Sequence, residues 1–277
     1  MEIKAIILDI DGTLLSSKKV ILPKTKEILI KAQEKGIKLI LASGRPLSGM
    51  VPLIKELKMD EYEGFFVSFN GALSTNCLTQ ETLFNQPLSI QTAQEILEHM
   101  KKFDVKPMIN KGEYMYVNNV YDNILNLPTG DMNVIEYESR GGNFKLCEIA
   151  DLAAFADFKL NKILIAGNPQ YLQENYQAMS APFIGKVNAM FTAPIYYEFT
   201  DLGVDKAKAL DVIAKKLAVK PENMIAFGDG QNDRSIIEYA GMGVAMGNAI
   251  DEVKEIADAI TLSNDEDGIA VTLEKLL

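Results

Sequence analysis

Residues 6–14 of the chain read IILDIDGTL, a short apolar run followed by two carboxylates, a glycine and a threonine. Such a run predicts a strand that is buried on both faces, as parallel sheets require. Three further runs of this kind, each followed by a polar turn, occupy residues 38–42, 65–68 and 224–227. Helical patterns lie between the runs, at residues 23–35, 206–217 and 234–239. This alternation of strands and helices predicts an α/β fold with a parallel sheet.

Composition and charge exclude several classes of partner. The chain has 277 residues, with 28 basic and 38 acidic side chains and a net charge of −10. This acidity argues against binding to nucleic acid or to an anionic membrane. We find no stretch that predicts a signal peptide or a transmembrane helix. Only two cysteines are present, Cys77 and Cys147, without a CxxC pair, so we expect a reduced, cytoplasmic protein.

The middle of the chain has a different pattern. Its strands are more polar and alternate, as at residues 113–117 and 186–191, and long helical patterns lie near residues 90–103 and 169–179. These features predict an inserted α+β domain with an antiparallel sheet that is solvated on one face. We therefore expect one domain to be built from residues 1–85 and 193–277, and the insert to cover residues 86–192.

Four polar clusters come directly after apolar runs or open the helix beside them. They contain Asp9 and Asp11, then Ser43, then Lys206, and finally Asp229, Asn232 and Asp233. In an open parallel sheet, ligands bind at the carboxyl ends of the strands. We therefore expect these clusters to meet at one edge of the sheet.

Asp9 and Asp11 are two carboxylates that project to the same side of an extended backbone. Carboxylates this close resist joint ionisation unless a cation lies between them or one keeps a proton. A hard divalent cation such as Mg²⁺ suits oxygen ligands of this kind. The alternative is a polar turn after a strand, in which an Asp caps the next helix.

The other clusters also have two interpretations each. Ser43 and Gly44 at the start of a helix that Pro46 opens could bind an anion, or Ser43 could be a simple N-cap. Lys206 opens a helix that Asp205 could cap; it either meets an anion or is an exposed lysine opposed by the helix dipole. Residues 228–233, GDGQND, form either an acidic site or a solvated loop.

Taken together, the four clusters resemble, in order and spacing, the four motifs of the haloacid dehalogenase (HAD) superfamily of phosphohydrolases. The details are similar to the Cof-type sugar-phosphatase branch, whose secondary signatures are matched at residues 70–72, 246–249 and 264–268. Two positions depart from that branch: Ala207 stands where Gly is frequent, and Ser43 where Thr is common. The resemblance implies a Rossmann-like parallel-sheet core with an α+β cap inserted between the second and third motifs.

The resemblance also implies a reaction, Mg²⁺-dependent hydrolysis of phosphate monoesters through an aspartyl phosphate. Asp9 would be the nucleophile and a metal ligand. Asp11 would be the general acid and base, and would bind the metal through its backbone carbonyl. Asp229 would complete the protein ligands of the metal, with Asp233 contacting the ligands rather than the ion, and Thr13 bonding the loop of the nucleophile.

The phosphoryl oxygens would be held by Ser43, the Gly44 N–H and Lys206, with Asn232 orienting them. Arg45 could clamp the phosphate or only brace its loop. The expected substrate is a small phosphorylated metabolite, most simply a sugar phosphate, and the expected state is a monomer or a weak homodimer.

Two other functions share these residues. A phosphomutase of the same superfamily would isomerise its substrate rather than release phosphate. A non-catalytic phospho-acceptor switch also uses an Asp, Mg²⁺ and a Lys, but it needs no acid for a leaving group, so Asp11 and the large insert argue against it.

Overall fold

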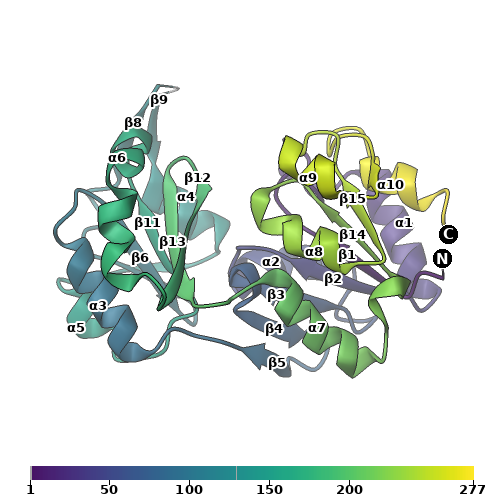
Figure 1. The fold of residues 1–277 in the computed structure, drawn as a ribbon, viewed down its shortest axis with the longest axis horizontal. Coiled ribbons are helices and arrows are strands. Elements are labelled where there is room, and N and C mark those ends of the chain that lie inside the picture. Colours follow the sequence, from purple (N-terminus) through teal and green to yellow (C-terminus); the bar gives the residue numbers. More distant parts are fainter. Residues whose placement is uncertain (1, 129) are drawn as a thin grey trace. The chain divides into compact units, whose positions relative to one another are not determined.

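The computed structural model of the chain describes residues 2–128 and 130–277. Internal contacts divide the chain into two compact units (Figure 1). The core unit comprises the chain up to Arg45 together with Met50–Asn85 and Asp205–Leu277. The inserted unit comprises Gln86–Val204 together with Pro46–Gly49. Within the described part of the chain, no helix has the length and apolar character of a membrane span.

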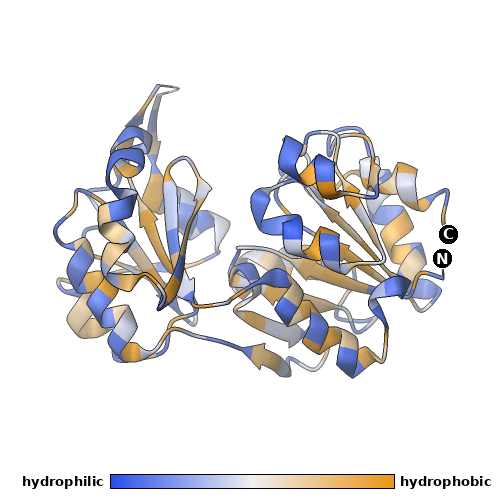
Figure 2. Cartoon of the chain, viewed as in Figure 1, coloured by the Kyte–Doolittle hydropathy of each residue, from blue (hydrophilic) through white to orange (hydrophobic). Residues whose placement is uncertain are grey.

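The core unit is built on an eight-stranded sheet in the order β16-β15-β14-β1-β2-β3-β4-β5. β1 (Ala5–Leu8) lies inside the sheet and pairs in parallel with β14 (Met224–Gly228) and β2 (Lys38–Ala42). Every residue of β1 is fully buried, as its apolar run predicts. Figure 2 shows the same apolar character along the neighbouring strands. The remaining strands are β3 (Phe65–Ser68), β4 (Leu73–Asn76), β5 (Thr82–Asn85), β15 (Met242–Ala245) and β16 (Ala259–Ile260).

The predicted parallel sheet is present, with an antiparallel addition at one edge. The strands from β16 to β3 are parallel, whereas β4 pairs antiparallel with β3, and β5 with β4. The helices of the core segments are α1 (Pro23–Glu34), α2 (Leu47–Glu56), α7 (Lys206–Leu217), α8 (Arg234–Tyr239), α9 (Asp251–Ile256) and α10 (Gly268–Leu273). Two short 3-10 helices lie beside the sheet, η1 (Phe69–Gly71) and η4 (Gln231–Asp233), and a third, η3 (Pro221–Asn223), precedes β14.

The inserted unit contains a six-stranded sheet in the order β10-β7-β6-β11-β13-β12 and a separate hairpin, β8-β9. Its strands are β6 (Lys106–Lys111), β7 (Tyr114–Val117), β8 (Ile124–Leu127), β9 (Gly130–Asn133), β10 (Lys145–Glu148), β11 (Ile163–Ala166), β12 (Val187–Ala193) and β13 (Tyr196–Asp201). Its helices are α3 (Ile90–Met100), α4 (Val134–Gly141), α5 (Leu152–Phe155), α6 (Pro169–Ser180) and the 3-10 helix η2 (Ala181–Phe183).

Two predictions about this sheet need correction. The sheet is not wholly antiparallel, because β10 pairs in parallel with β7. It is also not simply solvated on one face. Ile163 and Ile165 belong to one buried cluster, and the alternating Leu164 and Ala166 belong to a second. Because successive side chains of a strand point to opposite faces, both faces of the sheet carry apolar packing.

The inserted unit also ends later than residue 192, where the sequence placed its boundary. β12 and β13 pair antiparallel, and β13 pairs with β11 as well. A boundary between β12 and β13 would divide strands that share their ladder hydrogen bonds. The compact unit therefore extends to Val204.

Gly71, the last residue of η1, brings the segment after β3 close to the start of α7. Its φ is +108°, and an ideal Cβ at this position would lie 2.1 Å from the carbonyl oxygen of Asp205. Only glycine combines this backbone conformation with so close an approach. The contact places Asn70 and Lys206 in neighbouring segments.

We expect Gly71→Ala to destabilise the protein more than Gly36→Ala does. Gly36 has a similar φ of +88°, but an added Cβ there meets nothing within 4 Å. Gly36→Ala should therefore cost only the conformational penalty, about 1 kcal/mol. Gly71→Ala should cost about 1–3 kcal/mol more, because two backbone segments must separate. Urea unfolding of both variants measures the difference, and equal losses would contradict it.

Candidate active site

The sheet brings the predicted polar clusters to one edge. Asp9 follows β1, and its N–H donates to the carbonyl of Phe227 in β14 at 3.1 Å. Ser43 follows β2, and its N–H donates to the carbonyl of Val67 in β3 at 2.9 Å. Asp229 follows β14 directly. Since these strands are parallel, their carboxyl ends place the acidic and hydroxyl side chains side by side.

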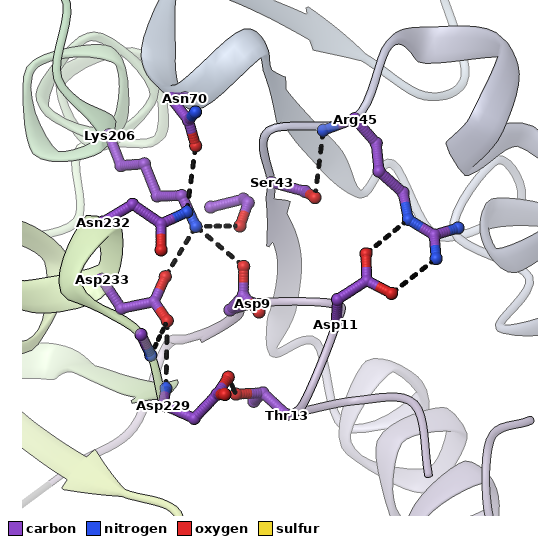
Figure 3. A network of polar contacts seen from close by, with 12 residues as sticks. Asp9, Asp11, Thr13, Ser43, Arg45, Asn70, Lys206, Asp229, Asn232 and Asp233 are labelled. Carbon is purple, nitrogen blue, oxygen red and sulfur yellow. Dashed lines mark hydrogen bonds and ion pairs between the residues drawn. The ribbon is translucent and has the colours of Figure 1, made fainter. Parts of the chain in front are cut away.

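Lys206 lies at the centre of the site (Figure 3). Its Nζ donates to Asp9 Oδ1 at 2.8 Å, to Asp233 Oδ1 at 2.6 Å and to the carbonyl of Ala42 at 2.9 Å. The residue is 1% exposed. Three acceptors satisfy the three N–H bonds of an ammonium group. Lys206 is therefore a buried charge in a complete hydrogen-bond shell, and not an exposed first-turn lysine.

Asp205 places Lys206 at the start of α7. As the sequence indicated, its side chain caps the helix, because Oδ1 accepts from the N–H groups of Ala207 and Lys208 at 2.8 and 3.3 Å. A lysine at the first position of a helix is opposed by the helix dipole. The carboxylates of Asp9 and Asp233 compensate for this position.

Desolvation and the charges of neighbouring groups determine the pKa values of Lys206 and of the carboxylates around it. Burial raises the pKa of Asp9 well above its ordinary value, and the charges of Asp233 and Asp229 add to this rise against the opposing charge of Lys206. Burial lowers the pKa of Lys206, but the charges of Asp233 and Asp9 outweigh it and raise the pKa overall. Lys206 therefore stays an ammonium, whereas burial and the neighbouring carboxylates favour a proton or a bound cation at Asp9.

Asp9, Asp229 and Asp233 could hold a metal ion. Each offers one carboxylate oxygen, and these oxygens lie within 4.8 Å of one another. Burial raises the pKa of Asp229 to about 6, although the hydrogen bond from Thr13 Oγ1 to Asp229 Oδ1, 2.8 Å long, opposes the rise. Carboxylate oxygens are the ligands that Mg²⁺ prefers. The donor set and its uncompensated charge therefore fit a hard divalent cation.

Asp233 also orders the loop that carries Asp229. Its Oδ2 accepts from the N–H groups of Asp229 and Gly230 at 3.0 and 2.9 Å, while Oδ1 accepts from Lys206. The residue is buried. Its carboxylate therefore links the acidic loop after β14 to the lysine. The prediction that Asp233 contacts the metal ligands rather than the ion stays a prediction.

Asp11 is turned away from this cluster (Figure 3). Its two oxygens accept from Nε and Nη2 of Arg45 at 2.6 and 2.7 Å, and Lys19 Nζ donates to Oδ1 at 2.9 Å. Burial raises the pKa of Asp11, but the hydrogen bonds and charges of Arg45 and Lys19 outweigh it, so the pKa is lowered. The carboxylate cluster therefore contains Asp233 rather than Asp11, and the expectation from the spacing that Asp9 and Asp11 face one cation with both carboxylates is wrong. The backbone contact of Asp11 to the metal, which the resemblance implies, stays a prediction.

The predicted phosphate-binding residues lie around Lys206. Ser43 is buried, and its Oγ accepts from the N–H of Arg45 at 3.2 Å. Asn232 Nδ2 donates to Asn70 Oδ1 at 3.0 Å. An ideal Cβ at Gly44 would lie 3.1 Å from Asn70 Nδ2, so a side chain at this position would crowd Asn70. Asn70 thus touches both the Ser43-Gly44 segment and the loop of Asn232.

Three residues have contacts that the sequence did not indicate. The sequence marks Asn70 only as part of a family signature, although Asn70 lies close after a predicted strand, as Asp9 and Ser43 do. Lys19 gave no signal, because it reaches Asp11 only through the turn that its own positive φ of 59° helps to form. Thr13 bonds Asp229 of the fourth cluster, rather than the loop of Asp9 as expected.

The fold and the cluster agree with a comparison against known families. The family model of haloacid dehalogenase-like hydrolases matches residues 6–273. The chain belongs to this family. The predicted superfamily, its Cof-type branch and the α/β fold class are thereby confirmed.

Related HAD proteins align over nearly the whole chain. The crystal structure of a haloacid dehalogenase-like hydrolase from Bacteroides thetaiotaomicron is 36% identical and superposes with a TM-score of 0.91, covering 100% of both chains. The 5-amino-6-(5-phospho-D-ribitylamino)uracil phosphatase of Bacillus subtilis is 29% identical and covers 98% of this chain and 94% of its own.

A sugar phosphatase of HAD subclass IIB is 25% identical, with a TM-score of 0.80 and coverage of 99% of this chain and 98% of its own. These matches confirm the predicted enzyme class, a phosphoric monoester hydrolase of the HAD type.

We expect Mg²⁺ binding by this HAD protein to weaken as pH falls below about 6, the pKa of Asp229. Asp229 takes up a proton as pH falls through this value, and the proton competes with the cation for the same carboxylate. The apparent affinity should decrease by about tenfold per pH unit if one proton is displaced per ion. Calorimetric titration of Mg²⁺ between pH 5 and 8 measures this slope. An affinity that is constant over this range would contradict the assignment of Asp229 as a ligand.

Proposed function

We propose that the protein is a Mg²⁺-dependent phosphatase that hydrolyses small phosphorylated metabolites, most simply sugar phosphates, through an aspartyl phosphate on Asp9. The observation that carries the proposal is the buried network in which Lys206 meets Asp9 and Asp233, with Asp229 alongside. Phosphoryl transfer depends mainly on in-line placement and on neutralised oxygens. A buried ammonium beside a carboxylate and a set of cation ligands supports that chemistry.

In the first step, a carboxylate oxygen of Asp9 attacks phosphorus, and the bond between phosphorus and the alcohol oxygen breaks. Asp11 gives its proton to the leaving oxygen. In the second step, water attacks phosphorus, Asp11 takes up the water proton, and the bond to Asp9 breaks to release phosphate. One residue can serve in both steps, because the acid of the first step is the base that the second requires.

Repulsion between Asp9 and a phosphate dianion has to be offset before attack can occur. Lys206 already contacts Asp9, so its ammonium lies beside the attacking carboxylate, and it would exchange one of its three acceptors for a phosphoryl oxygen. Bound Mg²⁺, held by Asp9, Asp229 and the backbone carbonyl of Asp11, would neutralise charge on both the carboxylates and the phosphoryl group. Ser43, the Gly44 N–H and Asn232 are assigned to the remaining phosphoryl oxygens.

The structure adds one requirement to this scheme. Arg45 and Lys19 hold Asp11 in a form that lacks the proton needed for the first step. Its side chain is 40% exposed, so it can rotate without breaking a buried contact. We infer that Asp11 leaves Arg45 when substrate binds and takes up its proton there. In this structure Arg45 pairs with the acid, and its alternative role as a phosphate clamp stays a prediction.

The substrate class is supported by the similar proteins. One is named as a phosphatase of a phosphorylated ribitylaminouracil and another as a sugar phosphatase, so both names describe small phosphorylated metabolites. We infer that the inserted unit is the cap that selects the substrate. We also infer a cytoplasmic protein that acts as a monomer or a weak homodimer, without nucleic acid or membrane partners.

The decisive experiment is a screen of the purified protein against phosphorylated metabolites, with and without Mg²⁺. We expect release of inorganic phosphate over many turnovers with Mg²⁺ and none after chelation. Asp9→Asn, which keeps the shape but removes the nucleophile, should lower kcat by at least about 10⁴-fold. Hydrolysis retained by this variant would reject Asp9 as the nucleophile. An isomerised product would indicate a mutase, and a single turnover would indicate a phospho-acceptor switch.

We expect Asp11→Asn to impair substrates according to their leaving groups. An alkyl alcohol needs a proton as it leaves, whereas p-nitrophenolate leaves without one. The variant should therefore lose about 10²–10⁴-fold in kcat for a sugar phosphate, in line with general acid catalysis, and much less in the first step for p-nitrophenyl phosphate. Burst kinetics with p-nitrophenyl phosphate isolate the first step. Equal losses in that step for both substrates would contradict the role of Asp11 as an acid.

A further inference from the structure

The backbone after β1 forms a single tight turn that carries both aspartates of the first motif. The N–H of Leu14 donates to the carbonyl of Asp9 at 3.2 Å, and the N–H of Leu15 donates to the carbonyl of Ile10 at 2.9 Å. Two carbonyls of this turn accept hydrogen bonds from side-chain amides far along the chain. Asn248 Nδ2 donates to the carbonyl of Gly12, and Asn264 Nδ2 donates to that of Leu15, both at 2.8 Å.

The segment around Asn248 is also bonded to the other acidic loop. The N–H of Met246 donates to the carbonyl of Gly228, and the N–H of Ile250 donates to the carbonyl of Asp229, both at 3.0 Å. Residues 246–250 therefore contact the loop of Asp229 through their backbone and the loop of Asp9 and Asp11 through the Asn248 side chain. This segment, which we call the bridging segment, connects the two loops that supply the acidic side chains.

The amide of Asn248 is held in one orientation. Its Oδ1 accepts from the N–H of Asn264 at 3.0 Å, which leaves Nδ2 to donate to Gly12. Gly247 makes this arrangement possible, because an ideal Cβ there would lie 2.8 Å from the N atom of Ser263. The N–H of Asn264 can only donate, so its bond to Oδ1 assigns which end of the amide faces the turn.

The loop of Asp9 and Asp11 and the loop of Asp229 lie so close together that their distance can change only slightly. An ideal Cβ at Gly12 would lie 2.3 Å from Asp229 Oδ2, so the first loop passes directly against the carboxylate of the second. Both loops carry negative charge, which drives them apart whenever no cation lies between them. A neutral amide can join them without adding charge. The bridging segment supplies that link.

We propose that Asn248 is a positioning residue that sets the spacing of the two acidic loops, and with it the affinity of the site for a divalent cation. Asn248 touches none of the proposed reacting atoms, since its contacts are backbone groups of Gly12 and Asn264. Asn264 supports it by orienting its amide and by holding the end of the same turn. A test of this inference by phosphatase activity rests on the proposed function. A test by Mg²⁺ binding does not depend on it.

The test is calorimetric titration of the full-length protein with Mg²⁺ alone. Asn248→Ala removes the link to Gly12 at an exposed position and leaves no buried cavity. We expect Mg²⁺ affinity to fall by about tenfold, the low end of the effects seen for groups that orient metal ligands. In the phosphatase assay, the Mg²⁺ concentration for half-maximal rate should rise by the same factor. The KM at saturating Mg²⁺ should stay within about twofold of the wild-type value, because the phosphate-binding groups are unchanged.

Asn223→Ala is the matched control. Asn223 Nδ2 donates to the carbonyl of Glu2 at 2.9 Å, which is also a side-chain bond to backbone across more than two hundred residues. It joins β1 and β14 at their amino ends, opposite to the acidic loops. We expect this variant to lose a similar amount of thermal stability and to bind Mg²⁺ as the wild type does.

Asn264→Ala provides a second, graded variant. It removes the side-chain bond to Leu15 but retains the backbone N–H that orients Asn248. Its loss of Mg²⁺ affinity should therefore be smaller than that of Asn248→Ala.

Three results would overturn the proposal: wild-type affinity in Asn248→Ala, an equal loss in Asn223→Ala, or no Mg²⁺ binding by the wild type. If the wild type binds Mg²⁺ but releases no phosphate from any substrate, the proposed function fails, while the calorimetry still decides the role of Asn248.

Discussion

The buried ammonium of Lys206 is the interaction on which the acidic edge of the sheet depends. Asp9 and Asp233 are almost fully buried, and both accept a hydrogen bond from this one group. Loss of one partner from a buried ion pair leaves an uncompensated charge in a poorly solvated place, which is strongly unfavourable. Without Lys206, the carboxylates could remain there only by taking up protons or by binding a cation. The charge of Lys206 therefore opposes the rise in the pKa of Asp9 that burial and the neighbouring carboxylates cause.

The aspartates of the first motif have different surroundings despite their spacing of two residues. Asp9 belongs to the buried network, whereas Asp11 is partly exposed and paired with Arg45 and Lys19. A nucleophile benefits from a fixed position, and a proton donor has to exchange partners during a reaction. Asp9 is held in the buried network, and Asp11 can exchange its partly exposed ion pair for another partner. These surroundings match the roles of nucleophile and proton donor that we propose for them. The difference between them arises because Gly12 turns the chain sharply away after Asp11, with a φ of +88°.

Most of the core could be predicted from the sequence, because each of its buried strands is a short apolar run that can be recognised without knowing its partners. β2 and β3 begin and end where the pattern placed them, and α7 starts at Lys206 as expected. The inserted unit was harder to predict. Its strands alternate in polarity, so the pattern did not reveal that β13 belongs with β12, or that β10 runs parallel to β7. Strand pairing depends on partners far along the chain, and periodicity within one strand does not specify them.

The sequence by itself determined which side chains stand at the ends of which strands, because apolar runs and the polar residues after them are local features. It thereby identified Asp9, Ser43, Lys206 and Asp229 as neighbours. Only the tertiary structure decided which atoms meet: that Asp233 shares the lysine with Asp9, that Asp11 faces Arg45, and that Asn248 connects the two acidic loops. The direction of a side chain depends on the groups packed around it, and those groups come from segments that can be more than two hundred residues away.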